Sequence, residues 1–358
     1  MRRLSLAANI FVILLSVAGI AGIFLIRGMN VVRSSTREGV AMDTVIRVTA
    51  SAVLGRRELD MALDGVFDLM RDLEKKFSMQ DPDSALSAVN RSAGASPVEI
   101  DGDLRSVLET ALRIADLTGG AFDPTIGAVT EIWRDDDGAG RLPGSDDLAA
   151  ALSLVGYGGL ELTEGRAYLE RAGARLDLGG IAKGYASQAA ARLLRERGIG
   201  SALIDLGGNV VALGHRPDGQ KWRIGVQDPF KDRGSPLCVL EVSNTSVVTA
   251  GVYERRWEMD GRSWTHIYDP STGMPIEGEL LSVTVVSDDP TEGDALSTAF
   301  MVLGPARALD LMRILPGVEA VFVSDLAENG REILATSGLR GSIELEDGGY
   351  RLSFTDVY

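Results

Sequence analysis

The chain has 358 residues with 36 basic and 51 acidic side chains, and this net charge of −15 argues against a nucleic-acid-binding surface, which needs clustered Lys and Arg. A single cysteine, Cys238, excludes an internal disulfide framework and a Cys-based zinc site, and two histidines are too few for a His-rich metal centre. The 42 glycines exceed the average share of roughly 7%. This excess predicts many tight turns, or backbone packed close to a ligand.

The N-terminal segment carries no charge from Leu4 to Ile26, a run of 23 residues. This is long enough to cross the hydrocarbon core of a membrane as a helix, and Arg2 and Arg3 before it favour a cytoplasmic N-terminus. The alternative is a cleaved signal peptide, with Ser16-Val17-Ala18 as the cleavage site. We therefore expect a bacterial inner-membrane protein whose large domain faces the periplasm, or an exported and cleaved protein.

The rest of the chain is predicted to be one domain. We assign residues 1–26 to the anchor or signal peptide, 27–40 to a polar tether and 41–358 to the domain, because no Pro/Ser-rich linker follows. Apolar residues three and four apart predict a helix over 57–77. Further helices are predicted over 103–117, 182–197, 293–303 and 306–315. Strand-like runs cover 200–206, 210–213, 222–226, 237–248, 264–268, 281–287, 319–324 and 350–354.

These elements do not alternate strictly between strand and helix. The pattern favours an α+β fold, with mixed or antiparallel sheets and packed helices, over a doubly wound parallel sheet.

The stretch from Leu176 to Ala186 joins an apolar run to a predicted helix through Gly179-Gly180. Backbone N–H groups at such a junction bind anions, and Lys183 adds positive charge. The spacing matches neither a P-loop nor the GxGxxG motif. The alternative is a plain turn before a helix, with a solvated lysine.

Asp294 and Thr298 lie four residues apart and share a face of a predicted helix. A carboxylate and a hydroxyl are hard oxygen ligands that suit Mg²⁺, which takes few protein ligands and keeps water or phosphate oxygens. The alternative is that Asp294 caps a helix N-terminus or complements its dipole, while Thr298 is only packed.

His266 lies in the segment Trp264-Thr265-His266-Ile267-Tyr268-Asp269-Pro270, where Trp264, His266 and Tyr268 are expected on one face of a strand. A histidine there either donates to a ligand phosphate, acts as a base, or is a satisfied structural residue. The segment Gly120-Ala121-Phe122-Asp123-Pro124 predicts a compact turn after a helix. Its small residues allow a ligand to approach the backbone, but a plain turn explains it equally well.

Together these segments resemble the ApbE family of FAD:protein FMN transferases, in the same order from about Met42 to Gly304. The matching segments are Met42-Asp43-Thr44, Asp83 to Leu86 with Asn90, Gly120 to Thr125, Asp177 to Ala186, Ile204 to Gly208, Trp222 to Pro229, His266 to Pro270 with Thr272-Gly273, and Asp294 to Thr298. The resemblance implies a T-fold-like architecture. It also implies an enzyme that splits FAD in the presence of Mg²⁺, attaches FMN to a threonine of an exported target flavoprotein and releases AMP.

The resemblance also implies roles for individual residues. Asp294 and Thr298 would be side-chain ligands of Mg²⁺, with the backbone carbonyl of Gly180 as a third ligand. Lys183 would contact the flavin dinucleotide, and His266 would contact its phosphates or remove the proton of the acceptor threonine. The remaining predicted FAD contacts are Ala121, Phe122, Asp123, Met42 and Ile267. Whether His266 or Asp294 is the effective base stays open at this level.

Three positions depart from the family pattern, because Gln80, Gln188 and Ala250 replace the usual Tyr, Asp and Ser. Two other functions remain compatible with the sequence. One is an FAD pyrophosphatase that releases FMN and AMP, and the other is a non-enzymatic flavin-binding maturation factor of a respiratory reductase. For the transferase, the expected partner is an Rnf- or Nqr-type subunit or another exported redox protein, together with the inner membrane.

Overall fold

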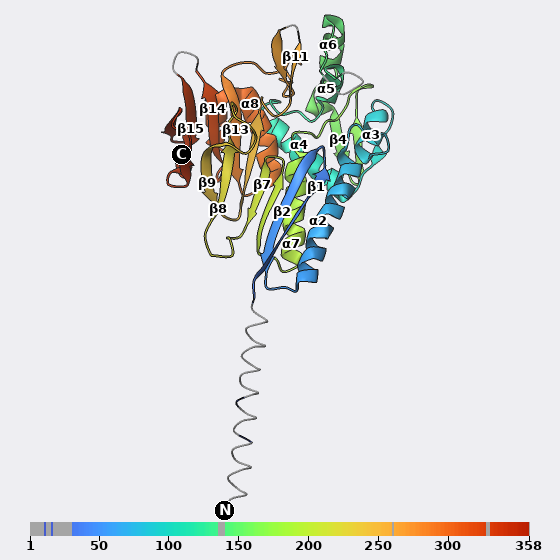
Figure 1. The fold of residues 1–358 in the computed structure, drawn as a ribbon. Helices are drawn as coiled ribbons and strands as arrows, with labels where there is room; N and C mark the ends of the chain where they lie inside the picture. Colours follow the sequence, from blue (N-terminus) through green and yellow to red (C-terminus); the bar gives the residue numbers. More distant parts are fainter. Residues whose placement is uncertain are drawn as a thin grey trace, which may run out of the picture.

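A computed structural model describes Phe11, Ser16 and residues 31–134, 140–259, 261–326 and 330–357. Within these residues, the largest sheet has nine strands in the order β1-β2-β6-β7-β10-β13-β14-β15-β17 (Figure 1). Neighbouring strands are antiparallel except β15 and β17, which are parallel. The strands are β1 (Arg33–Ala41), β2 (Thr44–Ala52), β6 (Ser201–Leu206), β7 (Asn209–Leu213), β10 (Thr245–Gly251), β13 (Leu280–Ser287), β14 (Glu319–Asp325), β15 (Arg331–Thr336) and β17 (Tyr350–Thr355).

Helices cover one face of this sheet. They are α2 (Arg56–Phe77), α4 (Gly102–Leu117), α7 (Ala182–Glu196) and α8 (Pro290–Met312). In α2 the buried residues recur at helical spacing, because one stripe of the helix must leave water. The apolar residues of these helices and of the facing strands form the main core.

A second, three-stranded sheet packs on the opposite face. It consists of β8 (Trp222–Gln227), β9 (Pro236–Val242) and β16 (Ile343–Leu345), in the order β16-β9-β8. Its apolar residues, including Leu237 and Leu240, form a separate core with residues of the large sheet such as Val247 and Val321. The large sheet is therefore the middle of three layers.

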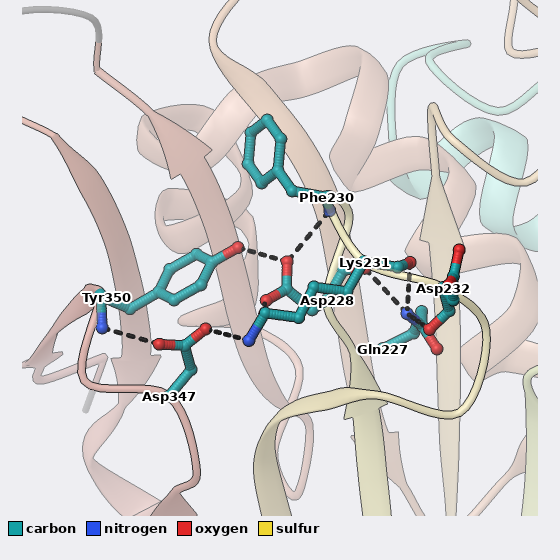
Figure 2. A network of polar contacts seen from close by, with 8 residues as sticks. Gln227, Asp228, Phe230, Lys231, Asp232, Asp347 and Tyr350 are labelled. Atoms are coloured by element: carbon teal, nitrogen blue, oxygen red, sulfur yellow. Dashed lines mark hydrogen bonds and ion pairs between the residues drawn. The ribbon is translucent and has the colours of Figure 1, made fainter.

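A buried polar network ties the loop after β8 to β17 (Figure 2). The carboxylate of Asp228 is fully buried and accepts hydrogen bonds from the Tyr350 hydroxyl at 2.7 Å and the Phe230 amide at 3.0 Å. Lys231 lies 3.5 Å from the same carboxylate and also pairs with Asp347. Because Asp228 finds its partners within the fold, this member of the matching segments acts as a structural residue.

A third cluster of buried residues forms a small lobe. Trp133, which follows α5 (Gly127–Ile132), packs its ring at 5.4 Å from that of Trp264 and 5.9 Å from that of Tyr268. The lobe also contains α6 (Ser145–Leu152) and the hairpin of β11 (Arg256–Met259) and β12 (Arg262–Thr265). The remaining elements are α3 (Ala85–Arg91), the 3-10 turns Tyr157–Gly159 and Ser337–Leu339, and a sheet of β3 (Val98–Glu99), β5 (Arg166–Leu169) and β4 (Leu160–Thr163).

The α+β class is confirmed, and the helices predicted over 57–77, 103–117 and 182–197 are α2, α4 and α7. The two helices predicted after residue 293 form α8, which is kinked where Gly304 takes a non-helical conformation. The single strand predicted over 237–248 is wrong. The chain turns at Asn244, in a left-handed conformation, and passes from β9 in the small sheet to β10 in the large one.

Two further predictions are corrected at strand boundaries. The tether expected over 27–40 is wrong from residue 33 onward, because those residues form β1 and pair with β2. The strand expected over 264–268 ends at Thr265, so Trp264, His266 and Tyr268 do not share one continuous strand.

One described helix, α8, is long and apolar enough to span a membrane. However, Ala295, Leu296, Ala299 and Phe300 of this helix are fully buried in the main core, so α8 is a core helix. The membrane segment predicted over residues 1–26 lies outside the described residues, apart from Phe11 and Ser16.

Gly184 permits the close approach of α7 and α8 and provides a test of the fold. A methyl group at Gly184 would lie 2.2 Å from the carbonyl oxygen of Pro290 and 2.7 Å from Cβ of Asp294. We expect Gly184→Ala to lower the free energy of unfolding by about 2–3 kcal/mol, because backbone must move to make room. Urea denaturation measures this change. Gly102→Ala is the control, since nothing lies within 4 Å of the added methyl group, and an equal loss in both variants would contradict the explanation.

Candidate functional site

The site begins with an extended segment that a single side chain holds in place. The side-chain oxygen of Asn90 accepts from the Leu176 amide at 2.7 Å, and its amide nitrogen donates to the Leu176 carbonyl at 3.0 Å. The next residue, Asp177, donates its amide to the carbonyl of Pro124 at 2.8 Å. These bonds place the glycine turn at 179–180 beside the turn at 120–125, although the two are distant in sequence.

The glycine turn leads directly into α7. The carboxylate of Asp177 accepts from the Gly179 amide at 2.8 Å, and Lys183 reaches back to donate to the Gly179 carbonyl at 3.2 Å. The amides of Ile181 and Ala182 donate to the Leu178 carbonyl, so the turn presents the N-terminal end of α7 together with the positive charge of Lys183. This combination suits a phosphate-bearing ligand.

Asp294 caps α7 from a different helix. Its carboxylate accepts from the amide of Gly184, in the first turn of α7, at 2.9 Å, although its side chain is only 4% exposed. The cap of its own helix α8 is Asp289, which accepts from the amides of Thr291 and Glu292. The alternative that Asp294 caps its own helix is therefore wrong, because Asp289 has that role, and the helix that Asp294 caps is α7.

Gly180, Thr298 and Phe122 lie close to this contact. A Cβ atom placed on Gly180 would lie 3.1 Å from the hydroxyl of Thr298 and 3.3 Å from the ring of Phe122. Thr298 lies one helical turn after Asp294 and donates to its carbonyl at 3.4 Å. Gly180 and the Thr298 hydroxyl are therefore neighbours, and Asp294, whose carboxylate meets the Gly184 amide, lies one helical turn before Thr298.

The donor set fits Mg²⁺ by its chemistry. One carboxylate and neutral oxygens are hard ligands, and Mg²⁺ completes its octahedron with water or phosphate oxygens. Among the residues that the structure describes, no three His, Cys, Asp or Glu side chains gather into a metal-binding group. A metal at this place would therefore bind through the mixed set of Asp294, Thr298 and Gly180.

The turn at 120–125 is held by Asp123. One carboxylate oxygen accepts from the amide and the hydroxyl of Thr125 at 2.8 and 2.6 Å, and the other accepts from the Tyr157 amide at 3.0 Å. Burial raises the pKa of Asp123, while these hydrogen bonds act in the opposite direction. Since both oxygens have protein partners, the Asp123 side chain fixes the turn, and Ala121 and Phe122 lie at its buried start.

His266 is held by a backbone carbonyl. Its amide and its Nδ1 both lie within hydrogen-bond distance of the Arg255 carbonyl, at 3.3 and 3.1 Å. A carbonyl only accepts, so Nδ1 carries the proton and Nε2 is left as an acceptor. Burial lowers the pKa of His266 to about 4, and the charges of Arg255 and Lys183 act in the same direction. The neutral imidazole is therefore a proton acceptor near pH 7.

The predicted FAD contact Met42 lies in the turn between β1 and β2. Met42 and Asp43 have φ angles of 52° and 56°, which is the two-residue type I′ turn usually made by Asn-Gly. The Met42 amide donates to Glu74 at 2.9 Å, and the Asp43 carbonyl accepts from Arg255 at 3.5 Å. Arg255 therefore links this turn to His266.

The predicted residues thus fall into two connected groups. Gly180, Lys183, Asp294, Thr298 and Phe122 gather at the start of α7. The second group, Met42 and His266, is connected through Arg255, and the charge of Lys183 acts on His266. Ile267, next to His266, is buried in the main core.

Sequence reasoning missed two contributors. Asn90 was part of a matching segment, but nothing predicted its pairing with Leu176. Arg255 holds His266 through its backbone carbonyl, and a backbone contact leaves no signal in the sequence. Gln188 stands where the family usually has Asp. Its side-chain oxygen accepts from the Thr291 hydroxyl at 3.0 Å and so joins α7 to α8.

Comparisons with known proteins agree on one family. A sequence model of the ApbE family matches residues 42–322. The FAD:protein FMN transferase of Treponema pallidum is 35% identical over 336 residues, which cover 90% of this chain and 92% of that protein. The protein of the same name from Escherichia coli K12 is 30% identical and covers 77% of this chain and 80% of its own.

Solved structures agree with the sequence comparisons. The ApbE protein of Thermotoga maritima superposes with a TM-score of 0.78 at 29% identity, over 87% of this chain and 99% of that one. The apo form of the Pseudomonas stutzeri flavinyl transferase ApbE gives a TM-score of 0.77 at 28% identity, over 87% and 97% of the two chains.

The lowered pKa of His266 predicts a pH-dependent stability. Between pH 6.5 and about 4 the unfolded chain binds a proton at this residue and the folded chain does not, so stability falls as the pH falls. From pH 7 to 5.5 we expect His266 to contribute a loss of about 1 kcal/mol. His266→Gln keeps a donor for the Arg255 carbonyl and should lose less stability over this interval. Urea denaturation of the metal-free, FAD-free protein at both pH values measures the difference, and identical pH dependence in the two proteins would contradict the assignment.

Proposed function

The chain belongs to the ApbE family of FAD:protein FMN transferases, and we propose that it transfers FMN from FAD to a threonine of an exported flavoprotein with the help of Mg²⁺. The observation that carries the proposal is the meeting of Asp294, Thr298 and Gly180 beside the N-terminus of α7. This arrangement offers hard oxygen ligands next to the positive charge of Lys183 and the N-terminal end of α7, which suits a metal-bound pyrophosphate.

The residues of the chain supply the other parts of the reaction. Nε2 of His266 accepts the proton of the threonine hydroxyl, because Nδ1 is already engaged with Arg255. The threonine oxygen then forms a bond to the FMN phosphorus, and the bond from that phosphorus to the bridging oxygen breaks, which releases AMP. Lys183 and the start of α7 stabilise negative charge on the phosphates.

Mg²⁺, when bound by Asp294, Thr298 and the Gly180 carbonyl, would neutralise pyrophosphate oxygens and lower the cost of charge that builds up on phosphoryl transfer. Asp294 is buried and already accepts from Gly184, so we assign it to metal binding and His266 to proton removal.

One incubation separates this function from the two alternatives. The full chain is mixed with FAD, Mg²⁺ and the soluble domain of an Rnf- or Nqr-type subunit that contains the acceptor threonine. Covalent flavin fluorescence on the subunit, lost when the threonine is replaced by Val, supports the transferase. Release of FMN and AMP without labelled protein indicates a pyrophosphatase, and FAD binding without turnover indicates a flavin-binding maturation factor.

Two substitutions at Asp294 distinguish metal binding from helix capping. Asp294→Asn keeps an oxygen that accepts from Gly184 but removes the negative charge, whereas Asp294→Ala removes both. We expect both variants to lose Mg²⁺-dependent turnover by on the order of 100-fold or more. Only Asp294→Ala should also lose about 1–3 kcal/mol of unfolding free energy, because the Gly184 amide loses its partner. Full activity in either variant would refute the metal assignment.

We also propose that residues 1–26 anchor the enzyme in the inner membrane with its domain in the periplasm. The support is the uncharged run from Leu4 to Ile26 and the path of β1, which begins at Arg33 and ends at the turn beside Arg255. At a rise of about 3.3 Å per residue, β1 is about 30 Å long. An anchored enzyme would therefore hold its site well away from the membrane surface. Extraction of membranes with alkaline carbonate distinguishes an anchor, which stays in the pellet, from a cleaved signal peptide.

A further inference from the structure

The outer face of the β1–β2 hairpin changes from polar to apolar at the end that lies next to the site. Away from the site, residues opposite each other form polar pairs: Ser34 with Ser51 at 2.7 Å, Thr36 with Thr49 at 2.9 Å and Glu38 with Arg47 at 2.7 Å. The last pair before the Met42-Asp43 turn is Val40 with Val45. These valines are 75% and 54% exposed, and Val40 has the highest exposed fraction among the large apolar side chains that the structure describes.

The backbone of the same strand has a free edge. β1 stands at the end of the large sheet, and the two-residue turn makes Ala41 and Thr44 the hydrogen-bonded pair that closes the hairpin. Hydrogen-bonded and non-bonded pairs alternate, so the N–H and C=O groups of Val40 and Glu38 point away from β2. No hydrogen bond is assigned to these backbone groups among the described residues. Such an edge pairs readily with another extended chain.

A chain of contacts connects the free edge of β1 to His266, the proton acceptor of the proposed reaction. Asp43, three residues after Val40, accepts from Arg255, and the Arg255 carbonyl holds His266. Three residues of chain span at most about 10 Å. The other side of β1 is covered by α2, since a Cβ on Gly39 would lie 2.7 Å from the ring of Phe67. A segment that approaches β1 therefore has only the edge and the valine face available to it.

We propose that the acceptor protein docks here: an extended segment next to its threonine pairs with the Glu38–Val40 edge of β1, and an apolar side chain of that segment covers Val40 and Val45. This inference rests on the proposed transferase function and names the surface that selects its protein substrate. The occupant is the acceptor, because the edge ends at the Met42-Asp43 turn, the Asp43 carbonyl accepts from Arg255, and the Arg255 carbonyl holds His266. The main-chain pairing gives affinity, and the valine face adds a preference for an apolar neighbour of the threonine.

Three variants test the surface. Val40→Lys and Val45→Lys place a charge on the valine face. Val40→Pro removes the N–H group at the free edge, and proline is tolerated in an edge strand. Val53→Lys is the matched control, because Val53 is 49% exposed and follows the opposite end of β2, far from the site. Labelling is measured against the concentration of the soluble Rnf- or Nqr-type domain, and AMP release from FAD is measured without the acceptor.

We expect each of the three variants to raise the KM for the acceptor by about tenfold, while AMP release without acceptor and the thermal midpoint stay at the wild-type values. Val53→Lys should label normally. If the wild-type enzyme labels the acceptor and all three variants have a normal KM, the docking surface is overturned and the transferase function stays intact. A change from dimer to monomer in light scattering would also overturn it, because a second copy would then occupy the edge. A wild-type enzyme that labels no acceptor would instead overturn the proposed function.

Discussion

The hydrogen bond from the Gly184 amide to the Asp294 carboxylate joins the two helices on which the site is built. A carboxylate that is 4% exposed is costly unless a donor compensates it, and here the donor is a helix N-terminus, which also carries favourable partial charge. The contact is possible only because Gly184 has no side chain. Because the helices lie this close, Thr298, one helical turn after Asp294, lies beside Gly180. A single constraint therefore fixes both the packing of α7 on α8 and the neighbourhood of the oxygen donors.

The rest of the site is positioned by bonds between side chains and backbone. Asn90 holds the extended segment through Leu176, Asp123 holds its own turn, and the Arg255 carbonyl holds His266. Bonds of this kind fix the course of loops without burying large apolar surfaces. Backbone carbonyls orient the polar ends of Lys183 and His266. The geometry of the site therefore depends on the conformation of turns as much as on the core.

The hairpin of β1 and β2 joins this site to the outside of the sheet. Its inner face packs on α2, and its outer face is lined by polar pairs as far as Val40 and Val45. The same hairpin supplies the Met42-Asp43 turn next to Arg255. The proposed docking edge and the turn beside Arg255 therefore follow one another along the same strand.

The sequence predicted much of this, and where it failed the reason is physical. Helices such as 57–77 were predictable because their apolar spacing is a local property. The sequence predicts a tether over residues 33–40 because β1 has a polar outer face and only Ser35 and Ala41 are buried on its inner face, so no hydrophobic alternation marks the strand. The break at Asn244 was missed because apolar residues continue on both sides of the turn, in two different sheets.

By itself, the sequence determined the kinds of chemical group available: one carboxylate and one hydroxyl at helical spacing, paired glycines before a lysine, and one histidine in the matching segments. The tertiary structure alone decided their partners. Asp294 caps α7 rather than its own helix, both oxygens of Asp123 are used inside the protein, and Nδ1 of His266 meets a carbonyl that any residue at position 255 would provide. Spacing along a chain fixes which groups share a face, whereas the contacts between distant segments arise only when the layers pack.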